Sequence, residues 1–100
     1  MQVRYRDRVA DVRRYIDAVI ARVRDGDGKV PREVRAAAID HPEGELCEKV
    51  AANAARVSDE DIALAKQSLT EDEIFEVVVC TAIGQAKRQY DAAMAALEEA

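Results

Sequence analysis

The sequence predicts an all-α protein of about five helices, the last of them much longer than the others. Two observations lead to this expectation. Apolar residues recur at three- and four-residue intervals through most of the chain, which is the pattern of one helix face. No segment alternates with the two-residue period of a strand over a useful length, except Val77–Val79, which lies inside the long helix. The chain has 100 residues, so we expect a single helical domain over residues 1–100.

The first helix is expected from about Tyr5 to Arg24, because its apolar residues share one face. These residues are Val9, Val12, Ile16, Val19 and Val23. Arginines occupy much of the remaining surface, namely Arg4, Arg6, Arg8, Arg13, Arg14, Arg22 and Arg24. We expect this arginine face to be solvated or to pair with acidic helices, and the acidic first turn of the last helix is one candidate partner. Binding of an anion is the alternative.

The segment Asp25-Gly26-Asp27-Gly28 ends the first helix, and we expect glycine there to take the left-handed conformation that closes a helix. Its alternating aspartates resemble the start of a calcium loop. The remaining ligands and the closing glutamate of such a loop are absent, so we expect a turn.

Three short helices are expected next, over about 31–38, 43–56 and 59–67. Pro31 suits the first position of a helix, and Ser58 can cap a helix whose first turn is acidic. The linker between the first two contains His41, the single histidine of the chain, followed by Pro42, which favours an extended conformation. A loop histidine is usually solvated, and a catalytic role is the alternative.

The last helix is expected from about Glu71 to Glu98, and it opens with a capping box formed by Thr70 and Glu73. Its length is roughly 40 Å, longer than a compact chain of this size is wide. One apolar face consists of Phe75, Val79, Ala82, Ala86, Tyr90, Ala93 and Leu97. Further apolar residues widen it in the first half, which we expect to be buried nearly all round. We expect the helix to pack on a second copy of the chain, with the small Gly84 allowing a close approach.

Charge and composition exclude several classes of partner. The net charge is -5 with charges well mixed, which argues against nucleic acid and anionic membranes as partners. No apolar run reaches the roughly 20 residues of a membrane span, and no secretory signal is recognisable at the N-terminus. Two cysteines do not make a disulfide framework, so we expect a reducing, cytoplasmic location. No pattern for a metal or a cofactor is present, and a small molecule stays a candidate ligand.

The second half of the chain resembles small members of the carboxymuconolactone decarboxylase family, in the AhpD-like superfamily. The resemblance extends from Leu46 to Leu97 and is carried by Lys49-Val50-Ala51, Val57-Ser58-Asp59-Glu60-Asp61-Ile62-Ala63-Leu64, Leu69-Thr70-Glu71-Asp72-Glu73-Ile74-Phe75-Glu76, Ala82-Ile83-Gly84 and Arg88. It implies an AhpD-like helical bundle that assembles into dimers, trimers or hexamers through helix contacts.

The chain lacks the residues that give the peroxidase and decarboxylase members of this family their activity. Peroxidase members carry Cys-x-x-Cys-x-x-x-His before the Thr/Ser-x-Glu-Glu-Ile run, with one thiolate attacking peroxide and the other resolving the product. The corresponding positions fall on about Asn53, Arg56 and Glu60. Asn53 and Arg56 are not nucleophiles, and Glu60 stands where the peroxidases have the proton-transferring histidine. Decarboxylase members rely on histidine and glutamate, whereas the one histidine here lies in an upstream linker.

Two hypotheses therefore stay open, and the sequence does not decide whether the chain is an enzyme. The leading one is a structural or small-ligand-binding oligomer without the thiol pair. The alternative is an enzyme, either a thiol-dependent peroxidase through Cys47 or a decarboxylase-type catalyst using Glu60 or the carboxylates Glu45 and Glu48.

Cys80 is expected to be a buried small hydrophobe, although a Cys47–Cys80 redox pair is an alternative. The tyrosines 5, 15 and 90 either line an apolar pocket or pack at the rim of the core.

Overall fold

The structure, a computed structural model of the chain, describes residues 5–99 and consists of α-helices with one short 3₁₀ turn in this range. The elements are α1 (Tyr5–Asp25), α2 (Arg32–Asp40), α3 (Glu45–Asn53), η1 (Ala54–Arg56), α4 (Asp59–Ala65) and α5 (Glu71–Glu99). The predicted all-α fold with a long C-terminal helix is confirmed.

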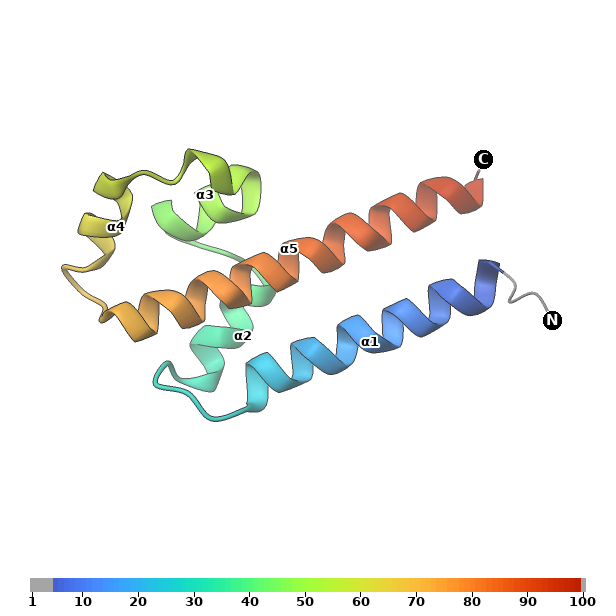
Figure 1. Cartoon of the computed structure of the whole chain (residues 1–100), viewed down its shortest axis with the longest axis horizontal. Coiled ribbons are helices and arrows are strands. Elements are labelled where there is room, and N and C mark those ends of the chain that lie inside the picture. Colours follow the sequence, from blue (N-terminus) through green and yellow to red (C-terminus); the bar gives the residue numbers. More distant parts are fainter. Residues whose placement is uncertain (1–4, 100) are drawn as a thin grey trace.

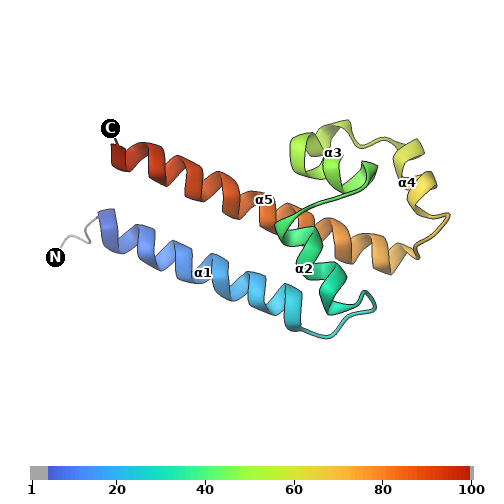
Figure 2. The same cartoon turned by 180° about the vertical axis from the view of Figure 1, so that it is seen from behind.

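The two long helices α1 and α5 lie side by side and antiparallel, and the three short helices surround the N-terminal half of α5 (Figures 1 and 2). The far halves of α1 and α5 extend beyond the short helices as a two-helix arm. The molecule therefore measures 54 × 29 × 20 Å, with a radius of gyration of 15.7 Å. A compact chain of this length has a radius of about 13 Å, so the fold is elongated.

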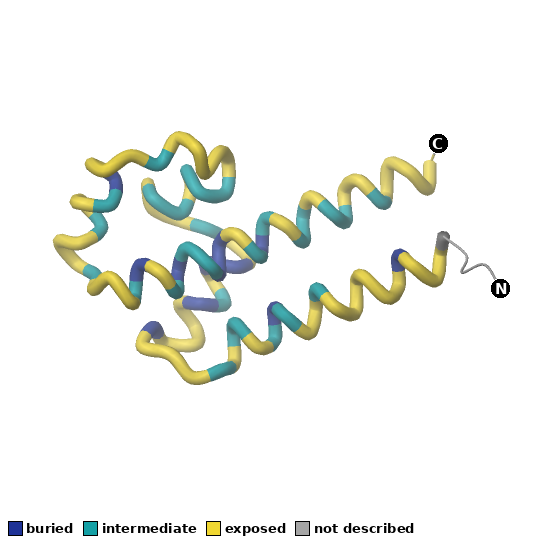
Figure 3. The backbone as a smooth tube through the Cα atoms, viewed as in Figure 1, coloured by how far each residue is buried: buried dark blue, intermediate teal, exposed yellow. Residues whose placement is uncertain are grey.

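The core lies where α1, α2 and α5 meet. Its centre consists of Ile20, Ala38, Ile39 and Cys80, with Ile16, Val23 and Ile83 packed around them. Figure 3 shows that burial is concentrated near this crossing, whereas the arm is mostly exposed. Burial of apolar area is the main favourable contribution to folding, so stability is concentrated in this small region.

Helix α2 crosses α5 at Gly84, which is buried. A Cβ at position 84 would lie 2.0 Å from Ile39 O, the carbonyl near the end of α2. One turn further along α5, Arg88 donates a hydrogen bond of 2.7 Å to the same carbonyl oxygen. The close approach that the sequence led us to expect between subunits is thus made by α2 of the same chain.

The turn after α1 is held by side chains rather than by a left-handed glycine. Among the described residues only Gly44, before α3, has a positive φ, of 88°. The expectation for Gly26 and Gly28 was therefore wrong. Gly28 instead leaves room for the Glu76 carboxylate, because a Cβ there would lie 2.3 Å from Glu76 Oε1. The Glu76 carboxylate enters this turn and accepts hydrogen bonds from Lys29 N, at 2.8 and 3.1 Å, and Val30 N, at 2.9 Å.

The starts of α4 and α5 agree with the caps predicted from the sequence, whereas Pro31, expected at the first helical position, is the N-cap of α2. Glu73 N donates to Thr70 Oγ1 at 3.2 Å, and Thr70 N donates back to the Glu73 carboxylate at 2.9 Å. Ser58 caps α4 through the equivalent pair with Asp61. Because these bonds satisfy N–H groups that a helix leaves unpaired, they fix where α4 and α5 begin.

Candidate functional site

Cys47 lies in the first turns of α3 and forms part of the wall between two cavities. The α3–α4 cavity has a volume of about 260 Å³ and contains Leu46, Leu64 and Asp61 in its lining. The α2–α3 cavity has a volume of about 430 Å³ and is lined on its α2 side by Val34, Ala37, Ala38 and His41. Both share Glu43, Cys47, Leu69 and Val77. The site therefore combines apolar and acidic side chains, and the Cys47 thiol belongs to both cavities.

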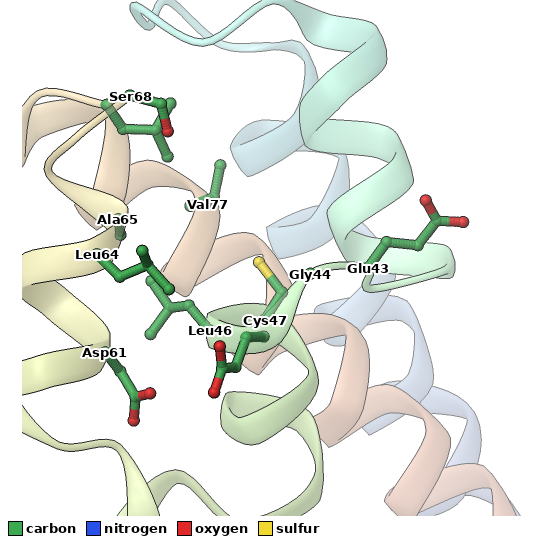
Figure 4. A pocket seen from close by; sticks show the side chains of 11 residues that line it. Glu43, Gly44, Leu46, Cys47, Asp61, Leu64, Ala65, Ser68 and Val77 are labelled. Carbon is green, nitrogen blue, oxygen red and sulfur yellow. The ribbon is translucent and has the colours of Figure 1, made fainter.

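Figure 4 shows the α3–α4 cavity from close by. Leu46 and Leu64 lie between α3 and α4, and the Cys47 sulfur is directed toward Val77 of α5. The carboxylates of Glu43, Glu45 and Asp61 also belong to the lining. Such a cavity favours an uncharged or cationic apolar molecule over an anion, because the acidic side chains repel negative charge.

His41 was expected to be merely solvated, and it is indeed exposed. It also lines the α2–α3 cavity together with Cys47 and Glu43. The fold thus brings a thiol, an imidazole and a carboxylate to one cavity, although the sequence separates His41 from Cys47 by a linker. The signal for this grouping is the turn at Gly44, whose positive φ of 88° lets the chain reverse before α3.

Cys80 has a different environment. Its side chain is fully buried in the core, as expected for a small hydrophobe. Burial raises the pKa of the Cys80 thiol, and the nearby Arg35 guanidinium only partly opposes this effect. Cys47 and Cys80 are both free thiols in the structure. A buried thiol with a raised pKa is a poor nucleophile at neutral pH.

Glu60 is exposed in the first turn of α4 and does not belong to the lining of either Cys47 cavity. The structure therefore does not bring the two candidate catalytic residues Cys47 and Glu60 into one cavity. Glu45 does line the α3–α4 cavity. Glu48 is exposed and lines a separate surface pocket with Lys49 and Arg56.

Asp61 is the carboxylate that sequence reasoning missed at the α3–α4 cavity. It is buried and accepts hydrogen bonds from Lys49 Nζ at 2.8 and 3.0 Å and from Ser58 N at 2.9 Å. The Lys49 bond, followed by the Ser58 backbone bond, lowers the pKa of Asp61 below its usual range. An ionised, fully bonded carboxylate is a poor proton acceptor, so Asp61 joins α4 to α3 rather than moving protons.

Among the arginines that the structure describes, none of the ion pairs joins the arginine face of α1 to the acidic first turn of α5. Arg13 lies 3.4 Å from Asp91, near the far end of α5, and Arg24 bonds to Asp25 at the end of α1. Within the described range, Asp72 of that first turn pairs instead with Lys29. These pairs are exposed, and such pairs contribute little to stability.

Tyr15 and Tyr90 are not among the residues that line the Cys47 cavities. Tyr15 is 70% exposed on α1. Tyr90 is half-buried and donates a hydrogen bond of 3.1 Å to Val9 O, which ties α5 to α1. Tyr5 begins α1, and its side chain lies outside the described part of the chain.

A second candidate surface lies on α5. We define the outer stripe as Phe75, Val79, Ala82, Ala86, Tyr90, Ala93 and Leu97, the apolar face predicted from the sequence. The structure leaves Phe75 69% and Leu97 52% exposed, and Ala82, Ala86 and Ala93 are exposed as well. Within a single chain the first half of α5 is therefore not buried all round. The core contacts of α5 are made by the opposite face.

Residues 5–99 contain no group of three or more His, Cys, Asp or Glu side chains that could hold a metal ion. Within the same range, none of the helices combines the length and apolarity that crossing a bilayer requires. Compared with known proteins, the chain matches no family model, no curated protein and no solved structure.

Proposed function

We propose that this chain is a homo-oligomeric helical protein of the carboxymuconolactone decarboxylase type that lacks the peroxidase thiol pair. The observation that carries the proposal is that α5 has two apolar faces, of which the chain itself covers only one. Ile74, Val77 and Cys80 are buried against the chain's own helices. Phe75 and Leu97, on the other face, are more than half exposed.

The surface area supports assembly. The chain exposes 7236 Å², whereas a compact monomer of this mass exposes about 5600 Å². A standard interface removes about 800 Å² from each partner. The exposed area beyond that of a compact monomer is large enough to cover such an interface.

The cavities at Cys47 are where such an assembly would hold a small molecule. About half of their lining is Leu, Val and Ala side chains, and the polar part consists mainly of carboxylates with Ser68 and His41. Ordinary ligand sites likewise combine apolar side chains with polar groups. The acidic residues Glu43 and Glu45 favour a neutral or cationic ligand over an anionic one.

Native mass spectrometry of three proteins tests the assembly: the unmodified chain, Ala86→Glu and Ala95→Glu. Ala86 lies in the middle of the outer stripe, whereas Ala95 is an exposed alanine of the same helix on the opposite side. We expect the unmodified chain and Ala95→Glu to be oligomeric at micromolar concentration. Ala86→Glu should dissociate with a Kd raised roughly 100-fold or more, because it would bury an unpaired carboxylate.

Circular dichroism of the three proteins serves as the folding control, since both substituted positions are exposed and the helix content should not change. An unmodified chain that stays monomeric at micromolar concentration would contradict the proposed assembly. Equal dissociation by both substitutions would show that the outer stripe is not the contact surface.

A second candidate function, reduction of a hydroperoxide by Cys47, is favoured by the grouping of Cys47, His41 and Glu43 in one cavity. The Cys47 thiolate would attack one peroxide oxygen and the O–O bond would break. The products are a Cys47 sulfenic acid and an alcohol, or water when the oxidant is hydrogen peroxide. The proton lost by the thiol goes to the departing oxygen, and His41 is the side chain in this cavity suited to transfer it.

Brief exposure to a low peroxide concentration, followed by trapping with dimedone and mass spectrometry, tests this function. We expect rapid labelling of Cys47, while the buried Cys80 stays unlabelled and serves as the internal control. His41→Gln should slow labelling roughly 100-fold, the size of a lost general acid–base group. A Cys47 that stays reduced, or a rate unaffected by His41→Gln, contradicts the proposed chemistry.

A further inference from the structure

We propose that the second copy of the chain packs its α5 antiparallel on the outer stripe, about a two-fold axis that passes at Ala86. This inference rests on the proposed assembly and specifies its symmetry and register. Three features of the stripe carry it: its spacing, its distribution of large and small side chains, and the charges that surround it.

The spacing of the stripe reads the same in both directions. From Ala86 toward the N-terminus the next members are Ala82, Val79 and Phe75, at steps of four, three and four residues. Toward the C-terminus they are Tyr90, Ala93 and Leu97, again at steps of four, three and four. An interface across a two-fold axis must complement itself, so that residue i meets j while j meets i. A stripe symmetric about one residue meets this condition when the helices are antiparallel.

Side-chain size follows the same symmetry. The large residues Phe75 and Leu97 lie at the two ends of the stripe. Phe75 of one copy would contact Leu97 of the other copy. Alanines 82, 86 and 93 occupy most of the space between them. Small residues let two helix axes approach to about 8 Å, so the centre can close while the large ends overlap. Val79 and Tyr90 depart from this pattern, but each would meet an alanine of the partner, at position 93 or 82, and the Tyr90 hydroxyl is already turned toward Val9 of α1.

The two ends of the stripe are exposed, so the described part of the chain does not cover them. Phe75 is 69% and Leu97 52% exposed, although they lie roughly 33 Å apart along one helix face. A second α5 has the length and the straight shape to cover both ends at once. The area that the chain exposes beyond a compact monomer exceeds the roughly 800 Å² per partner that a stable dimer needs.

Charge favours the antiparallel direction over the parallel one. The first turn of α5 contains Glu71, Asp72 and Glu73. A parallel pair would place two such acidic turns beside each other and would align the two helix dipoles, both of which are unfavourable. An antiparallel pair separates the acidic first turns by the length of the helix. Glu98 and Glu99 follow the stripe at the other end, but neither position belongs to its face.

Disulfide cross-linking with diamide as the oxidant tests the register. The background carries Cys47→Ser, and Cys80 is retained because it is fully buried. In this background, Ala86→Cys places a thiol on the two-fold axis and Leu97→Cys places one at an end. The double variant Phe75→Cys, Leu97→Cys places one at each end. A disulfide needs Cα atoms within about 7 Å, so only residues that meet across the interface are joined.

The proposal predicts that Ala86→Cys forms a covalent dimer at least roughly ten times faster than Leu97→Cys alone, because the latter has no thiol opposite it. The double variant should cross-link as fast as Ala86→Cys. If the protein is oligomeric by native mass but Leu97→Cys joins to itself, or Ala86→Cys does not cross-link, the antiparallel register is overturned while the assembly stands. If the protein is monomeric, both proposals fail.

Discussion

Replacing Gly84 with alanine is expected to lower the free energy of unfolding by about 3 kcal/mol, although alanine is the better helix former by about 1 kcal/mol. The new Cβ would lie 2.0 Å from Ile39 O and 2.9 Å from Ile39 Cα. Both are backbone atoms of α2, so neither can move away without shifting the helix that packs on α5. Arg88 also holds this carbonyl, which restricts the adjustment further. Urea unfolding followed by circular dichroism measures the loss.

The matched control is the reverse substitution at an exposed position of the same helix. Ala92→Gly should cost about 1 kcal/mol through helix propensity alone. Helix propensity favours alanine at both positions. Glycine is preferred at position 84 only because α2 leaves no space for a Cβ there. If Gly84→Ala instead stabilised the protein, the close approach of α2 to α5 would be wrong.

Local patterns in the sequence predicted the helices and their starts. The capping pairs Thr70–Glu73 and Ser58–Asp61 join residues three positions apart, so the sequence shows both partners side by side. The long helix runs from Glu71 to Glu99, one residue beyond the expected end. The segment 43–56 differs more, because its last turn tightens into the 3₁₀ turn η1.

The partners of each helix face could not be predicted in the same way. Spacing shows that Gly84 and Phe75 lie on helix faces, but it does not show what covers those faces. Gly84 meets Ile39 of the same chain, whereas Phe75 stays 69% exposed. The grouping of His41 with Cys47 at one cavity likewise depends on how α2 and α3 pack against α5, a tertiary arrangement that periodicity does not encode.

Replacing Glu76 with alanine is expected to lower the free energy of unfolding by about 3 kcal/mol, because hydrogen bonds to a charged group contribute about 1.5–3 kcal/mol each. The carboxylate accepts from Lys29 N and Val30 N, which lie 47 and 46 residues away in the sequence. Val30 is only 3% exposed, so its N–H would have little access to water as a replacement. Urea unfolding provides the measurement.

Glu71→Ala is the matched control, since Glu71 is exposed and pairs only with the exposed Lys66 among the described contacts. This substitution should lower the free energy of unfolding by less than about 0.5 kcal/mol.

A double-mutant cycle with Gly28 separates the loss of these hydrogen bonds from a general weakening of α5. In the native protein a Cβ at position 28 would lie 2.3 Å from Glu76 Oε1, and the two backbone bonds prevent that oxygen from moving aside. Gly28→Ala should therefore be destabilising in the native background and nearly neutral once Glu76 is alanine. The two effects would then be strongly non-additive, as is typical of residues in direct contact. Additive losses would mean that Glu76 does not occupy the turn, and the connection between α1 and α2 would have to be held by its other contacts, namely the bonds of Arg35 to Val23 O and Gly26 O and the pair of Arg32 with Asp25.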